Sequence, residues 1–182
     1  MDSPPSLHRH VQDGSDVLIW DGLFSPDFVT SLYKTLNNTE YDSLSGDQAY
    51  RSWVCPFDVE DFSGHPLFQR TCEAFAEEHP GLQPKCLSAK AQVLTFGDFV
   101  PLQAPLYDSD VRSVLYFANS EWREEWAAET ILFSKDQGGA LAIPPKPGRV
   151  ALFQANQTRR LGVPSRLTHL TSVVVQFEVE MQ

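Results

Sequence analysis

The second half of the chain contains a single histidine, His169, because no histidine lies between His79 and His169. A histidine can accept or donate a proton near neutral pH. An aspartate can orient such a histidine or act as a base, and an arginine can stabilise an oxyanion or enolate. These residue types predict proton-transfer chemistry such as cyclisation, isomerisation or dehydration. A lone histidine on a strand also has the simpler interpretation of a structural residue.

Other reactive side chains form no recognisable site in the sequence. The cysteines Cys55, Cys72 and Cys86 are odd in number and lack the C-x-x-C spacing of a zinc site. They therefore predict buried free thiols rather than a disulfide framework. We find no nucleophile arrangement and no phosphate-binding loop.

The charge balance excludes several classes of partner. The formal net charge is -10 and the pI is about 4.8, so the protein repels phosphate backbones and anionic membrane surfaces. The first 16 residues contain no apolar run of the kind found in secretory signals or membrane spans. We therefore expect a cytoplasmic protein with a small-molecule ligand and with no nucleic-acid or membrane partner. Nothing in the sequence indicates an oligomeric state.

Local patterns predict the elements that must position the reactive residues. Ser25 before Pro26 predicts a helix start, and residues 66–78 predict a second amphipathic helix. Residues 39–64 have no clean period and predict irregular structure with one strand near 50–54. After residue 87 the pattern favours strands, which we expect at 87–96, 114–117, 130–133, 140–143, 150–153 and 171–179.

Several short strands after two helices predict a mainly β protein with flanking helices, arranged as a cupin-like jelly roll of two sheets. The 182 residues fit one domain of ordinary size. We expect residues 1–16 to be a loosely ordered lead-in, since polar termini are commonly mobile. Residues 17–182 then form the single domain.

Several short motifs in a fixed order give the sequence a family resemblance. They are Asp21-Gly-Leu-Phe-Ser-Pro26, Gly97-Asp98-Phe99, Trp122…Trp126-x-x-Glu129-Thr130, Pro145-Lys-Pro-Gly-Arg149 and Gly162-Val-Pro-Ser165. In this order they resemble the prolyl-hydroxylase-like 2-oxoglutarate/Fe(II)-dependent oxygenase superfamily. The resemblance covers most of the chain. It implies a double-stranded β-helix whose catalytic block runs from Phe96 to Phe177.

The resemblance also shows which residues stand at the superfamily's iron site. In such enzymes iron binds two histidines and a carboxylate, and a basic residue holds the carboxylate of the co-substrate. By position, Leu106 replaces the first histidine and Asp108 keeps the carboxylate. Arg159, or at most Thr158, replaces the second histidine. His169 stands where the basic residue is expected.

These replacements argue against the superfamily's cofactors. Leucine has no lone pair for a metal, and arginine is a permanent cation that repels Fe(II). A shifted alignment offers Asp110 or Gln103 as oxygen ligands, which still make a poor iron site beside a guanidinium. We therefore predict a divergent member that lacks the iron-binding histidines. Iron and 2-oxoglutarate, expected in relatives, are predicted to be lost.

The resemblance places the remaining polar residues around one pocket. We assign the catalytic roles to Asp108, His169 and Arg159. The pocket residues are Gln103, Tyr107, Trp126, Asn156 and Arg166. If Asp108 faces Arg159, the guanidinium replaces the metal ion and keeps the carboxylate charged. That pair could be a structural filling of a vacated site or part of a catalytic group.

Three functions remain open at this point. The first is a metal-independent enzyme of the cyclase, isomerase or lyase type, acting on a small organic molecule of specialised metabolism. The second is a non-catalytic protein of the same fold that binds a small molecule or a protein. The third is a 2-oxoglutarate-dependent oxygenase with an atypical iron site.

Overall fold

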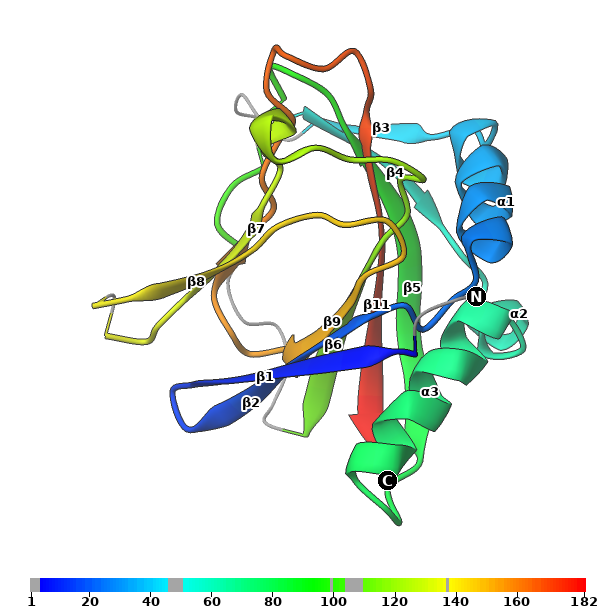
Figure 1. Cartoon of the computed structure of the whole chain (residues 1–182), viewed down its shortest axis with the longest axis vertical. Helices are drawn as coiled ribbons and strands as arrows, with labels where there is room; N and C mark the ends of the chain where they lie inside the picture. The colour runs from blue at the N-terminus through cyan, green and yellow to red at the C-terminus, as the bar shows by residue number, and fades with distance from the viewer. Residues whose placement is uncertain (1–3, 46–50, 99, 104–109, 137) are drawn as a thin grey trace.

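A computed structural model describes residues 4–45, 51–98, 100–103, 110–136 and 138–182. These ranges form two antiparallel sheets, and helices cover one face of the larger sheet (Figure 1). The predicted mainly β jelly roll with flanking helices is therefore confirmed. None of the helices in these ranges combines the length and the apolar character needed to span a bilayer.

The larger sheet has eight strands in the order β1-β2-β9-β6-β11-β5-β4-β3. Strand β11 lies near its middle, between β6 and β5, and is antiparallel to both. The strands are β1 (Ser6–Gln12), β2 (Ser15–Asp21), β3 (Asp42–Ser45), β4 (Arg51–Pro56), β5 (Pro84–Leu94), β6 (Val111–Phe117), β9 (Val150–Gln154) and β11 (Ser172–Met181).

The smaller sheet has three strands in the order β10-β7-β8. These are β7 (Thr130–Phe133), β8 (Ala140–Ile143) and β10 (Arg159–Arg160), and a short 3-10 helix, η1 (Glu124–Trp126), precedes them. The helices of the opposite side are α1 (Pro26–Asn37), α2 (Val59–Ser63) and α3 (Pro66–Glu78). Figure 1 shows these helices and the β7–β8 hairpin on opposite sides of the larger sheet.

Local chemistry starts the two longer helices where the sequence predicts. The hydroxyl of Ser25 accepts a hydrogen bond from the N–H of Phe28 at 3.3 Å, with Pro26 as the first helical residue of α1. At α3, Nδ1 of His65 accepts from the N–H of Leu67 at 3.2 Å. Both caps satisfy backbone donors that the helix itself cannot satisfy.

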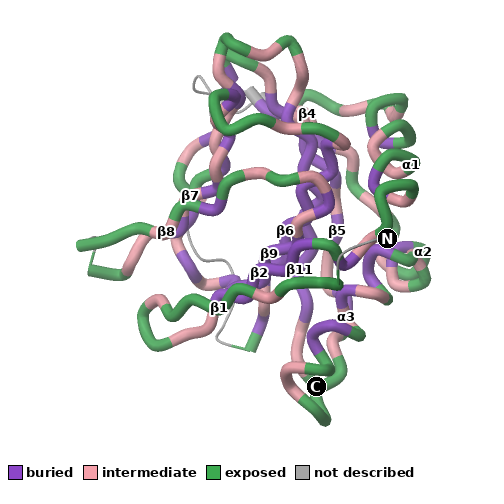
Figure 2. Tube along the Cα trace, in the orientation of Figure 1, coloured by how far each residue is buried: buried purple, intermediate pink, exposed green. Residues whose placement is uncertain are grey.

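The core has two layers, one on each face of the larger sheet. Strand β11 supplies both, because successive side chains of a strand point to opposite faces. Val173, Val175 and Phe177 pack against the helices, whereas Val174 packs between the two sheets. Gln176 therefore points, like Val174, to the space between the sheets. Figure 2 shows that β2, β6, β9 and β11 carry much of the buried chain.

Two predicted stretches differ from the structure. Residues 1–16 were expected to be a loose lead-in, whereas β1 pairs with β2 over seven residues, Ser6–Gln12. Its side chains are mostly exposed, so backbone hydrogen bonds rather than apolar burial place it in the sheet. Residues 39–64 contain strands β3 and β4 and the helix α2 instead of one strand. Asp58 starts that helix by accepting hydrogen bonds from two backbone N–H groups.

Candidate functional site

Arg159 is the first residue of β10, and its backbone is paired on both sides, with β7 of the smaller sheet and with Gln103. It is in register with Leu132 of β7, and it exchanges backbone hydrogen bonds of 2.8 and 3.3 Å with Gln103. Leu132 lies in the core layer between the sheets, and register partners point to the same face. The Arg159 side chain therefore points toward the larger sheet. It is 7% exposed, and its guanidinium lies 5.5 Å from the centre of the Phe153 ring.

Glu178 of β11 receives this guanidinium from the opposite sheet. Nη2 of Arg159 lies 3.1 Å from Oε1 of Glu178, whose side chain is 5% exposed. Gln176 donates its amide N–H to the same oxygen at 3.0 Å, and the hydroxyl of Ser113 donates to Oε2. Both oxygens of the buried carboxylate thus have donors, as a buried charge requires. The pair joins the two sheets across the interior of the barrel.

Lys90 of β5 lies beside this ion pair, opposite Gln176 in the strand register. Burial lowers the pKa of the Lys90 amine, and the positive charge of Arg159 lowers it further. The negative charge of Glu178 offsets part of this effect. Burial and the charge of Arg159 thus shift Lys90 toward its neutral form, which is the form of an amine that can accept a proton. Perturbed titratable groups beside a specific charge partner are typical of functional sites.

Three buried amide oxygens in this region lack a hydrogen-bond partner among the described residues. They are the Oε1 atoms of Gln92, Gln103 and Gln176. Each such atom costs about 1–3 kcal/mol unless water or a ligand satisfies it. These three oxygen atoms therefore favour the binding of a polar ligand or water between the sheets. We give the name barrel cluster to these glutamines together with the ion pair and the polar side chains beside it. Its members are Lys90, Gln92, Gln103, Ser113, Arg159, Gln176 and Glu178.

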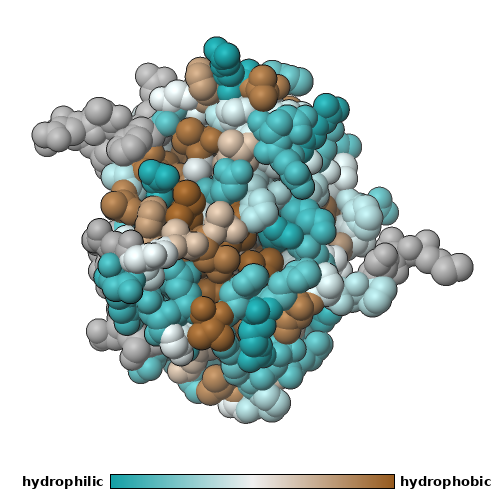
Figure 3. All heavy atoms as spheres, turned by 60° about the vertical axis from the view of Figure 1, so that its left-hand side comes forward, coloured by the Kyte–Doolittle hydropathy of each residue, from teal (hydrophilic) through white to brown (hydrophobic). Residues whose placement is uncertain are grey.

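The side of the molecule that carries β7 and β8 is turned forward in Figure 3. Hydrophobic side chains run through the middle of that face, between hydrophilic ones (Figure 3). The apolar layer beneath belongs to the space between the two sheets, where Leu132 and Ile143 are fully buried. The barrel cluster therefore lies beside the apolar layer that packs between the two sheets.

Solved structures with a similar fold identify the architecture. A prolyl hydroxylase from Trichoplax adhaerens, solved with a hypoxia-inducible-factor peptide, matches with TM-score 0.66 and 10% identity over 90% of this chain and 83% of that one. An oxidoreductase of the 2OG-Fe(II) oxygenase family from Burkholderia pseudomallei matches with TM-score 0.69 and 7% identity over 90% and 85%. The chain has the fold of the 2-oxoglutarate/Fe(II) oxygenases.

The same fold is found in a ring-forming enzyme. SnoK, a non-heme α-ketoglutarate-dependent carbocyclase of nogalamycin biosynthesis, matches with TM-score 0.64 and 9% identity over 90% of this chain and 79% of that one. Neither a protein-family model nor a curated protein matches the sequence. These identities are low, so the likeness concerns the oxygenase fold and not the reaction.

Iron does not fit the described residues around Arg159. The barrel cluster offers one carboxylate, from Glu178, and that carboxylate is already bound to a guanidinium. Iron in the 2-oxoglutarate oxygenases needs two histidines and a carboxylate, and the barrel cluster contains no histidine. In the described ranges, no group of three or more histidine, cysteine or acidic residues is arranged to hold a metal ion.

The structure describes six of the eight sequence-predicted site residues, and it brings Arg159 and Gln103 together. Asp108 and Tyr107 lie outside the described residues, as does Leu106. Arg159 instead forms an ion pair with the carboxylate of Glu178. The other predicted residues lie elsewhere in the fold. His169 and Arg166 are exposed on the segment before β11. Asn156 is half-buried after β9, and Trp126 is buried in η1.

Sequence reasoning missed Lys90, Gln176 and Glu178, although a signal was present. Polar residues two apart in a strand point to the same face. Gln176 and Glu178 have this spacing in an otherwise apolar strand, and Lys90 has it with Gln92. Polar side chains on the inner face of two neighbouring strands could have predicted a polar interior.

Proposed function

We propose that this protein is a metal-independent enzyme that catalyses proton transfer on a small organic molecule bound between its two sheets. The observation that carries the proposal is the buried ion pair of Arg159 with Glu178. In the family that the sequence resembles, an iron-binding histidine stands at the position that Arg159 occupies here. A guanidinium paired with a carboxylate there supplies fixed positive charge without a metal.

Lys90 and Arg159 have complementary roles in such a reaction. A neutral Lys90 amine removes a proton from a carbon next to a carbonyl group, and the electron pair of that C–H bond moves to the carbonyl oxygen. The positive charge of Arg159 stabilises the resulting enolate. With a β,γ-unsaturated carbonyl compound as substrate, the enolate is a dienolate, and return of the proton from Lys90 to its γ-carbon gives the α,β-unsaturated isomer and regenerates the amine. Glu178 orients the guanidinium throughout.

Ligand binding without turnover is the second candidate. The unpartnered oxygens of Gln92, Gln103 and Gln176 favour it, because they call for a hydrogen-bond donor whether or not a reaction follows. SnoK supports the enzymatic reading in one respect, because it forms a carbon ring on this fold. SnoK depends on α-ketoglutarate, so it gives no support to metal independence.

Deuterium exchange tests the proposal before the substrate is known. Chelator-treated protein is incubated in D2O with a panel of small ketones and 1,3-dicarbonyl compounds, and loss of the activated C–H signal is followed by NMR. We expect catalysed exchange by the wild type and by Lys85→Met, an exposed lysine of the same strand. Lys90→Met should reduce the rate about 100-fold or more.

Three outcomes contradict the proposal. Equal exchange by Lys90→Met and wild type assigns the exchange to another group. Exchange or 2-oxoglutarate decarboxylation that requires added Fe(II) restores the atypical oxygenase. Saturable binding of a panel compound, without exchange by any variant, supports the binding protein instead.

A further inference from the structure

A pocket lies on the helix-covered face of the larger sheet, away from the space between the sheets. It has a volume of about 340 Å³ and lies between α1 and the segment that joins β4 to α3. We call it the α1–α2 groove. Its lining residues are Leu32, Thr35, Leu36, Thr39, Pro56, Phe57, Asp58, Asp61, Phe62, His65, Leu67 and Val175.

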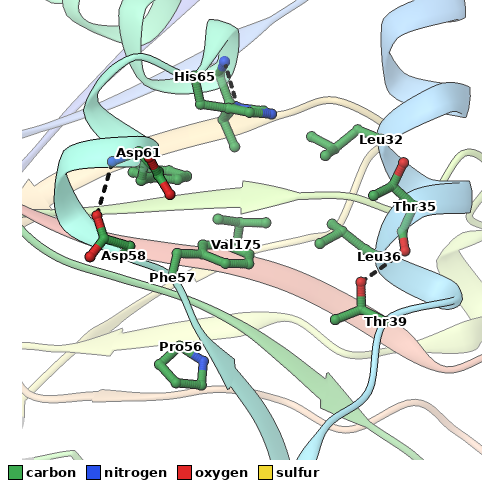
Figure 4. A pocket seen from close by; sticks show the side chains of 12 residues that line it. Leu32, Thr35, Leu36, Thr39, Pro56, Phe57, Asp58, Asp61, His65 and Val175 are labelled. Atoms are coloured by element: carbon green, nitrogen blue, oxygen red, sulfur yellow. Dashed lines mark hydrogen bonds between the residues drawn. The ribbon is translucent and has the colours of Figure 1, made fainter.

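The two walls of the α1–α2 groove differ in character. Figure 4 shows Leu32 and Leu36 of α1 on one side and Asp58, Asp61 and His65 on the other. Val175 of β11 lies on the floor between them. The volume falls within the range of small-molecule sites, and an apolar wall opposite a few polar groups is their usual composition.

Three aromatic rings stack in a row along the second wall. Phe57 and Phe62 have ring centres 5.5 Å apart and an angle of 11° between their planes. Phe62 and His65 have centres 5.9 Å apart and an angle of 5°. Burial lowers the pKa of His65, and its Nδ1 accepts a hydrogen bond from Leu67, so the third ring favours the neutral form. A cation is attracted to the face of an aromatic ring, and in this row the outer faces of Phe57 and His65 are the ones not stacked against another ring of the row.

Two carboxylates that have no cationic partner among the described residues flank this row. Asp58 and Asp61 are three residues apart at the start of α2 and both are exposed. None of the ion pairs between described residues involves either one. Asp58 uses Oδ1 to cap α2, which leaves Oδ2 for a ligand. Negative charge therefore lies beside the aromatic row.

We propose that the α1–α2 groove binds a small organic cation: an ammonium group between Asp58, Asp61 and the ring row, with an apolar body against Leu32 and Leu36. Carboxylates and aromatic faces both select positive charge, and the net charge of -10 attracts cations from a distance. Phe62 of the ring row and Val175 of the floor also pack in the core beneath α1 and α3. This inference does not depend on the reaction proposed between the sheets.

Titration of the full-length protein with benzyltrimethylammonium, followed by amide NMR shifts, tests the proposal. We expect saturable shifts at groove residues with a Kd of about 0.1–1 mM. Asp58→Asn/Asp61→Asn should weaken binding about fivefold or more, and asparagine keeps the helix cap. Phe57→Leu should also weaken it. Glu60→Gln, on the same helix but outside the groove, should bind like the wild type.

Matched ligands make the result decisive. Benzyl alcohol has a similar ring without charge, and phenylacetate carries a negative charge. Equal binding of either compound would show an apolar pocket without charge selection and would overturn the proposal. So would wild-type affinity in Asp58→Asn/Asp61→Asn, or no groove shifts at about 10 mM benzyltrimethylammonium, a concentration at which even millimolar affinity is visible.

Discussion

The ion pair between the sheets makes a quantitative prediction for the free energy of unfolding. Arg159 and Glu178 are 7% and 5% exposed, with nitrogen and oxygen 3.1 Å apart. Arg159→Met leaves a buried carboxylate without its cation, and Glu178→Met leaves a guanidinium near Lys90. Breaking such a pair from one side costs about 3–5 kcal/mol. Each single variant should therefore lose roughly that much stability.

The loss of unfolding free energy in the double variant Arg159→Met/Glu178→Met should be smaller than the sum of the losses in the two single variants. Buried pairs replaced by apolar side chains of similar size are often close to neutral in stability. Here Ser113 and Gln176 lose the acceptor that they share, so we expect a loss below about 3 kcal/mol. The coupling energy of the cycle should then reach at least about 3 kcal/mol.

Urea denaturation of the four proteins at pH 7 measures the cycle, provided that the transitions are two-state and share one slope. Arg160→Met, the exposed neighbour on β10, is the control and should change stability by less than about 0.5 kcal/mol. Single variants that each lose less than about 1 kcal/mol would refute a desolvated pair. A folded double variant that fails in the exchange assay would assign the pair to catalysis as well as to stability.

Two further predictions concern the scaffold. Burial raises the pKa of Asp21, but Arg149 and Lys146 outweigh it and lower the pKa from 3.8 to about 2. The resulting stability is complete above pH 4 and is lost as pH falls toward 2, by about 2 kcal/mol. Acid denaturation of Asp21→Asn should lack this step; an unchanged acid profile would contradict the assignment. Ala127 has φ 58° and ψ -138°, a region suited to glycine, so Ala127→Gly should raise the unfolding free energy by about 1 kcal/mol. A lower melting temperature for that variant would show that no strain is stored there.

The sequence by itself determined the parts of this protein that depend on neighbouring residues. Ser25 and Pro26 start α1 because capping and a fixed φ are local properties. The strand-favouring composition of residues 171–179 predicted β11, which runs from Ser172 to Met181. The sequence also indicated that Arg159 is a poor iron ligand, because a guanidinium is unsuited to iron in any fold. The match to oxygenase structures agrees with the motif order.

Only the tertiary structure decided which groups meet. Glu178 follows Arg159 by 19 residues and lies on the other sheet, so pairing them requires the strand order and the register of both sheets. The pKa of Lys90 depends on burial and on charges from two other strands. The α1–α2 groove arises where the helices pack on β11. Such properties come from contacts between distant segments, and no local pattern in the chain encodes the distances between them.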